Sequence, residues 1–125
     1  MRLSPQIIKM ITDSDSKALA TIGQFGINVV PVSTIRIVDG KILLMNYFLK
    51  KTLANIAENP HVALACWKGL VGCQIKGTVR YVDTGPEFEE TKDWVTENVA
   101  NRTLKGLLEI TPNEIYDVSP PAIKK

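Results

Sequence analysis

Two lysines and a threonine stand together where an apolar stretch gives way to a helical pattern. Lys50, Lys51 and Thr52 follow a continuous apolar run at residues 42–45 and precede apolar side chains at helical spacing in residues 53–57. The first turn of a helix leaves backbone N–H groups unpaired and carries positive charge, so it attracts anions. We expect Thr52 at the N-cap of this helix and a phosphate group beside the lysines. A capped surface helix with solvated lysines explains the local pattern equally well.

Length and charge narrow the class of protein. With 125 residues and 45% hydrophobic side chains, the chain has the size of one domain, expected to span residues 1–125. Fifteen basic and thirteen acidic residues give a net charge of +2, too small for a nucleic-acid-binding surface. Neither a signal-peptide core nor a membrane-length apolar run occurs. We therefore expect a cytoplasmic protein that binds neither nucleic acid nor membrane.

Few side chains are suited to metal binding or nucleophilic catalysis. His61 is the only histidine, and Cys66 and Cys73 are the only cysteines, so a four-ligand zinc site is not expected. The cysteines fall on neighbouring strand-like segments with apolar surroundings, which favours buried thiols over a disulfide. No Ser or Cys lies in a nucleophile motif, so we predict no catalytic residue and a structural His61.

Turn residues divide the rest of the chain into short apolar runs typical of strands. Asp39-Gly40 is a strong signal for a tight hairpin, and Pro112 is expected at an edge or a bend. Strands are predicted over residues 18–22, 27–34, 35–38, 41–46, 62–67 and 72–82, with one interrupted or two short strands over 107–118. Helical patterns begin near Ser4-Pro5 and at Gly85-Pro86. The predicted fold is mainly β with peripheral helices, an antiparallel barrel of six to seven strands.

The order of these motifs resembles the pyridoxamine 5'-phosphate oxidase-like superfamily of FMN-binding split barrels. The matching segments are residues 28–34, the Asp39-Gly40 hairpin, Lys50-Lys51-Thr52, Glu58-Asn59-Pro60, and residues 62–67, 75–79 and 84–89. The last segment looks most like the small homodimeric FMN-binding proteins. The resemblance implies a single FMN-binding domain with the split-barrel fold.

The resemblance also implies which residues hold the cofactor. The FMN phosphate would lie on Lys50, Lys51 and Thr52, with Asn46 and Asn55 flanking it, although asparagine at such positions also forms turns or caps helices. The flavin ring and ribityl chain would lie along a five-residue segment: Val30, Pro31, Val32, Ser33 and Thr34. Pyridoxamine phosphate oxidation itself is not expected, because the oxidases have Tyr-Thr where this chain has Leu44-Met45. They also have a glutamine at the site matched by Gly72, which Gln74 can replace.

The implied assembly is a homodimer with FMN near the interface. FMN would carry the chemistry of an oxidoreductase or electron-transfer protein, with a nicotinamide cofactor or a redox protein as partner. Related split barrels bind a deazaflavin or haem instead, which is the second hypothesis. The third is a non-enzymatic ligand-binding barrel that stacks nucleotides or a partner on its aromatic side chains, namely Phe25, Tyr47, Phe48 and Trp67.

Overall fold

The computed structural model describes residues 3–47 and 49–120. This part of the chain forms three helices and seven strands, in the order α1 (Pro5–Asp13), β1 (Ser16–Gly23), β2 (Gly26–Pro31), β3 (Ile35–Val38), β4 (Lys41–Asn46), α2 (Lys51–Glu58), β5 (His61–Lys68), β6 (Val71–Val82), α3 (Pro86–Asn98) and β7 (Gly106–Asp117). None of these helices is long and apolar enough to cross a lipid bilayer.

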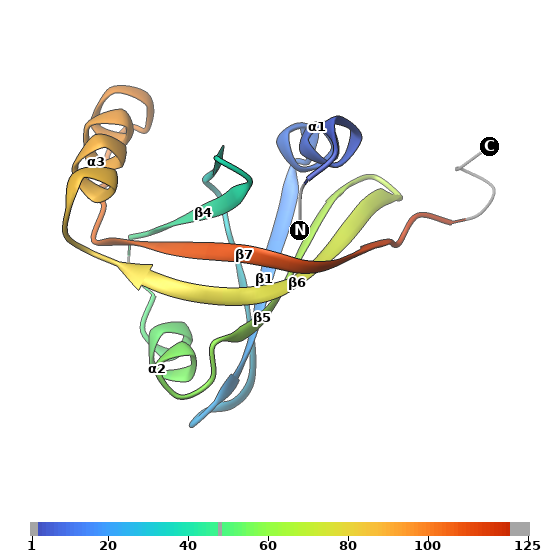
Figure 1. Ribbon diagram of the computed structural model, residues 1–125, viewed down its shortest axis with the longest axis horizontal. Coiled ribbons are helices and arrows are strands. Elements are labelled where there is room, and N and C mark those ends of the chain that lie inside the picture. The colour runs from blue at the N-terminus through green and yellow to red at the C-terminus, as the bar shows by residue number, and fades with distance from the viewer. Residues whose placement is uncertain (1–2, 48, 121–125) are drawn as a thin grey trace.

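All seven strands belong to one antiparallel sheet, in the order β2-β1-β5-β6-β7-β4-β3. In the view of Figure 1, α1 and α3 lie on one side of the long β6–β7 pair and α2 lies on the other. Each strand contributes apolar side chains to one shared core, among them Leu19, Val30, Ile37, Leu44, Leu64, Ile75 and Ile110. The predicted split barrel, mainly β with peripheral helices, is therefore confirmed.

Strand β4 is buried on both of its faces, which explains its continuous apolar sequence. Ile42 and Leu44 enter the barrel core, whereas Leu43 and Met45 point outward into a second cluster beneath α3. Phe88 and Val95 of α3 complete this second cluster together with Tyr47, Leu104 and Leu107. Because each fully buried large apolar side chain contributes about 1.5–3 kcal/mol, this contact helps to hold α3 on the barrel.

The predicted turns and strand ends are largely confirmed. Asp39 and Gly40 both have positive φ (51° and 77°) and join β3 to β4 as a two-residue hairpin. Pro112 lies in β7 beyond Ile110, where the pairing with β4 ends, so its missing N–H breaks no ladder on that side. The second strand, however, ends at Pro31 rather than at residue 34. Residues 32–34 instead form the link to β3, which pairs with β4 at the other end of the strand order.

Candidate functional site

A cavity of about 330 Å³ lies between the end of β2 and the end of β4. Among the described residues, its lining is mostly apolar and includes one charged side chain: Val30, Pro31, Val32, Ser33, Leu44, Met45, Tyr47, Leu49 and Arg102. Four of the five residues predicted to lie along a flavin, Val30 to Ser33, form one wall of this cavity. Such a space suits a flat aromatic ring, because apolar walls favour burial of ring faces and the adjacent backbone can pair with polar ring edges.

Thr34, the fifth predicted residue, does not line the cavity but forms hydrogen bonds to two residues that do. Its Oγ1 accepts a hydrogen bond from the hydroxyl of Tyr47 (3.1 Å), and its carbonyl oxygen accepts one from the backbone N–H of Met45 (3.3 Å). These bonds fix two of the residues that line the opposite wall. Thr34 therefore positions the site without appearing in its lining.

Arg102 and Tyr47 are lining residues that the sequence did not single out as cofactor contacts. Arg102 lies between α3 and β7, and its guanidinium carbon is 5.9 Å from the centroid of the Tyr47 ring. The side chain is exposed and brings a positive charge to the cavity. Only the course of α3 brings this residue to β4, so no local sequence signal indicates it.

The two predicted lysines follow the cavity directly along the chain. Leu49 lines the cavity, Lys50 is the N-cap residue of α2, and Lys51 is the first residue of the helix. Both lysine side chains are exposed. The first bond of the helix ladder runs from the N–H of Ala54 to the carbonyl of Lys50 (3.1 Å), so the N–H groups of residues 51–53 lie outside that ladder. An anion at this end of α2 gains two cations and backbone donors.

The predicted N-cap at Thr52 is wrong. Lys50 occupies the N-cap position, and its side chain makes no capping hydrogen bond to the helix. Thr52 is 1% exposed, and its Oγ1 accepts a hydrogen bond from Nδ2 of Asn28 on β2 (3.1 Å). This bond turns the hydroxyl into the protein, away from the exposed helix end, so Thr52 joins α2 to β2.

Asn55 is fully buried and connects α2 to the β1–β2 hairpin. Its Oδ1 accepts a hydrogen bond from the N–H of Phe25 (3.0 Å), and its Nδ2 donates to Oγ1 of Thr21 (3.2 Å) and to the carbonyl of Gly26 (3.1 Å). Both amide hydrogens are thus used within the protein. These contacts give Asn55 a structural role.

Asn46 is also buried, at the end of β4. Its Nδ2 donates to the hydroxyl of Tyr81 (2.8 Å), and its Oδ1 accepts from the N–H of Leu49 (2.8 Å). The second bond holds the chain where it turns from β4 toward the lysines. Asn46 therefore shapes the approach to the helix end.

Gln74 lies apart from the other predicted site residues. It is on β6 with Ala65 and Tyr116 as its cross-strand partners, on the outer face of the sheet. It is not among the residues that line the cavity. Within one chain, Gln74 and the β2–β4 cavity are separate.

The aromatic stacking surface of the third hypothesis does not form in the described residues. Phe25 follows one end of β1, whereas Trp67 pairs with Ser16 at the other end. Tyr47 is buried in the second cluster, and Phe48 lies outside the described residues. These side chains do not gather on one surface.

The histidine and the cysteines lie away from the cavity. His61 is exposed at the start of β5, where it lines a hollow of about 480 Å³ on the outer face with Lys76 and Glu114. Cys66 and Cys73 are cross-strand partners and remain free, buried thiols. Burial, with the neighbouring Cys73 as the second cause, raises the pKa of Cys66 to about 12. Thiolate chemistry is therefore not accessible to Cys66 near neutral pH.

Comparison with known proteins shows where this architecture recurs. The model of the family described as pyridoxamine 5'-phosphate oxidase matches residues 3–119. An uncharacterized protein of Methanocaldococcus jannaschii is 28% identical over 127 residues, which cover 94% of this chain and 82% of the relative.

Several solved structures share the fold at low sequence identity. HupZ of Group A Streptococcus has a TM-score of 0.82 at 20% identity, covering 94% of both chains. An FMN-binding protein of Syntrophomonas wolfei has a TM-score of 0.77 at 20% identity, covering 91% of this chain and 84% of its own. HutZ, the heme storage protein of Vibrio cholerae, scores 0.70 at 15% identity, covering 94% and 95%. An F420 reductase scores 0.68 at 14% identity, covering 91% and 98%.

Proposed function

This chain belongs to the pyridoxamine 5'-phosphate oxidase family, and on that premise we propose that it is an FMN-binding flavoprotein. The observation that carries the proposal is the position of the cavity. Residues 30–33 form one of its walls, and Leu49 of its lining is followed at once by Lys50, Lys51 and the start of α2. An apolar space for a ring and an anion-binding helix end are thus adjacent, as FMN requires.

Each part of the cofactor finds suitable residues. The ring would lie between residues 30–33 and the β4 side of the cavity, with Tyr47 held in place by Thr34. The phosphate would lie on Lys50, Lys51 and the first-turn N–H groups of α2. Thr52 and Asn55 act one layer further in, where they fix α2 against β1 and β2. Binding of the phosphate therefore depends on the two lysines and on the position of α2, which Thr52 and Asn55 fix.

We assign the protein to the oxidoreductases or electron-transfer proteins. FMN supplies hydride or single-electron chemistry when bound. Among the described residues, the side chains that line the cavity include no carboxylate and no histidine, so the protein's own contribution is to bind the cofactor, orient it and exclude water. Arg102 adds a cation that suits an anionic electron donor, such as a nicotinamide cofactor or the acidic surface of a redox protein.

A homodimer is part of the proposal, and the outer face of β1 and β2 supports it. Ile27, Val29 and Ile22 are 78%, 62% and 48% exposed and lie side by side in the β1–β2 register. Small side chains, Ala20 and Ala63, continue this face toward β5. An exposed apolar face of this kind suits burial against a second copy. Gln74 lies on the same outer face of the sheet and would approach that second copy.

Aspartates at Ile27 and Val29 are expected to convert a dimer into a monomer, because they place charges in the buried interface. Sedimentation velocity checks this result, and Leu70→Asp, an exposed apolar residue on the β5–β6 hairpin, is the matched control. A double variant that sediments like the wild type would contradict this choice of interface.

Deazaflavin and haem are the alternative cofactors, because the structural relatives include an F420 reductase and a heme storage protein. We expect reconstitution to give an FMN absorbance spectrum, with no stable complex of F420 or haem. His61→Ala should leave FMN binding and its reduction unchanged, since His61 lies on the outer face away from the cavity. A haem complex that forms in the wild type and is lost in His61→Ala would instead favour the haem alternative.

A further inference from the structure

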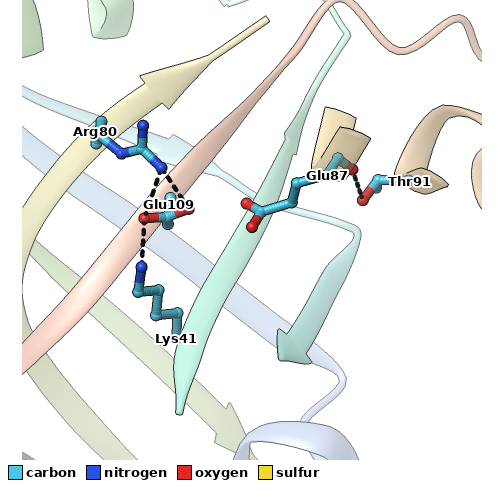
Figure 2. A network of polar contacts seen from close by, with 5 residues as sticks. All are labelled: Lys41, Arg80, Glu87, Thr91 and Glu109. Atoms are coloured by element: carbon cyan, nitrogen blue, oxygen red, sulfur yellow. Dashed lines mark hydrogen bonds and ion pairs between the residues drawn. The ribbon is translucent and has the colours of Figure 1, made fainter. Parts of the chain in front are cut away.

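Glu109 is a buried carboxylate held by two cations on the outer face of β7. Its side chain is only 3% exposed. Lys41 of β4 donates a hydrogen bond to Oε1 (3.0 Å), and Arg80 of β6 donates from Nη2 to Oε1 and Oε2 (3.3 and 3.2 Å), as Figure 2 shows. Burial by itself would raise the pKa of Glu109, but the hydrogen bonds from Lys41 and Arg80, with the Glu87 carboxyl group as a further potential donor, outweigh it and lower the pKa. Glu109 is therefore ionised near neutral pH.

A second carboxyl group, that of Glu87, faces this ionised group from the first turn of α3 (Figure 2). Its Oε1 is buried and has no hydrogen-bond partner among the described residues. The neighbouring Glu109 carboxylate is the largest cause that raises the pKa of Glu87, because it can accept a hydrogen bond only from the protonated acid, and burial is the second. A carboxylate with one oxygen buried and unpaired beside another carboxylate is costly, whereas the neutral acid can donate its proton to Glu109.

We propose that the first turn of α3 is held against β7 by a proton that Glu87 shares with Glu109, and that loss of this proton to solvent releases the turn. The groups that face Glu87 come from three strands: Lys41 from β4, Arg80 from β6 and Glu109 from β7. The side chains of Lys41 and Arg80 are 44% and 68% exposed and already bind Glu109. They therefore compensate a second buried negative charge only weakly.

The direction of the pH effect follows from the two opposite shifts. The pKa of Glu87 is raised in the folded protein, so its stabilising contribution is complete at acidic pH and is lost as the pH rises through the raised value. The pKa of Glu109 is lowered, so its contribution is complete above its ordinary pKa and is lost only in stronger acid. The attachment of the first turn of α3 to β7 is therefore most stable at mildly acidic pH, between the lowered pKa of Glu109 and the raised pKa of Glu87.

Release of the turn would affect the surroundings of the β2–β4 cavity. Phe88, one residue after Glu87, packs in the second cluster with Met45 and Tyr47, and both of these line the cavity. The far end of α3 leads to Arg102, which lines the same cavity. The shared proton thus connects solvent pH to the helix that covers this side of the barrel.

Hydrogen exchange of the backbone amides measures the attachment without reference to any cofactor. In the wild type, we expect the first-turn amides of α3 to lose protection as the pH rises from about 5 to about 8, after correction for intrinsic exchange. The first of these amides is that of Glu89, which donates a hydrogen bond to the carbonyl of Gly85 (3.0 Å). In Glu87→Gln, which keeps a neutral donor at every pH, protection should persist throughout this range.

Glu89→Gln is the matched control, because Glu89 is an exposed acid in the same first turn. It should retain the wild-type loss of protection. Thermal melting gives a second readout: Glu87→Gln should melt above the wild type at about pH 8, and the difference should close toward about pH 5. The proposal would be overturned if the protection of these amides in the wild type did not change with pH. It would also be overturned if Glu87→Gln showed the same loss of protection as the wild type.

Discussion

Replacing Lys50 and Lys51 together with alanine is expected to weaken FMN binding about one hundredfold, because each ammonium group contributes about tenfold to the binding of a phosphate at an exposed site. Both side chains are exposed at the start of α2, and neither takes part in the core clusters. The thermal stability of the cofactor-free protein should therefore stay close to that of the wild type. Fluorescence titration with FMN measures the change in dissociation constant.

The matched control for this variant removes two lysines elsewhere. Lys68 at the end of β5 and Lys92 on α3 are exposed and do not line the cavity. Lys68→Ala/Lys92→Ala changes the net charge by the same amount, so it reports the nonspecific electrostatic part of the effect. Equal losses of affinity in the two double variants would contradict a phosphate site at α2.

Asn55→Ala is expected to lower the free energy of unfolding by about 3 kcal/mol, because it removes the three hydrogen bonds of this buried amide and leaves their partners unpaired. The melting temperature should fall by about 10 °C in the absence of FMN. Differential scanning calorimetry of the cofactor-free protein checks this result.

Asn98→Ala provides the comparison for this loss. Asn98 is an exposed asparagine whose Nδ2 donates to the carbonyl of Trp94 at the end of α3 (2.9 Å). Its replacement should change the melting temperature by no more than about 2 °C. An Asn55→Ala protein that melts like the wild type but binds FMN poorly would show that Asn55 contacts the cofactor rather than bracing α2.

The sequence predicts the strands because they depend on local patterns. The apolar run of β4 and the Asp39-Gly40 turn define their elements without knowledge of the rest of the chain. The assignment of residues 30–33 to the cofactor site rests on the family resemblance, and these residues are consecutive in the chain.

The sequence does not predict which way a polar side chain turns at a helix end. Thr52 is a suitable N-cap residue by type, but its hydroxyl pairs with Asn28, 24 residues earlier in the chain. Asn55 likewise meets partners on the β1–β2 hairpin. Arg102 reaches the cavity only because α3 returns the chain to β4. These contacts depend on strand order, which is a property of the whole fold.

The central claim, that the β2–β4 cavity and the lysines at α2 together bind FMN, is tested most directly by comparing FMN with riboflavin, which lacks the phosphate. Equilibrium titration of the wild-type protein should show that FMN binds about one hundredfold more tightly than riboflavin. The Lys50→Ala/Lys51→Ala protein should show nearly equal affinities for the two. Equal affinities in the wild type, or no binding of FMN in either its oxidised or its reduced state, would contradict the account.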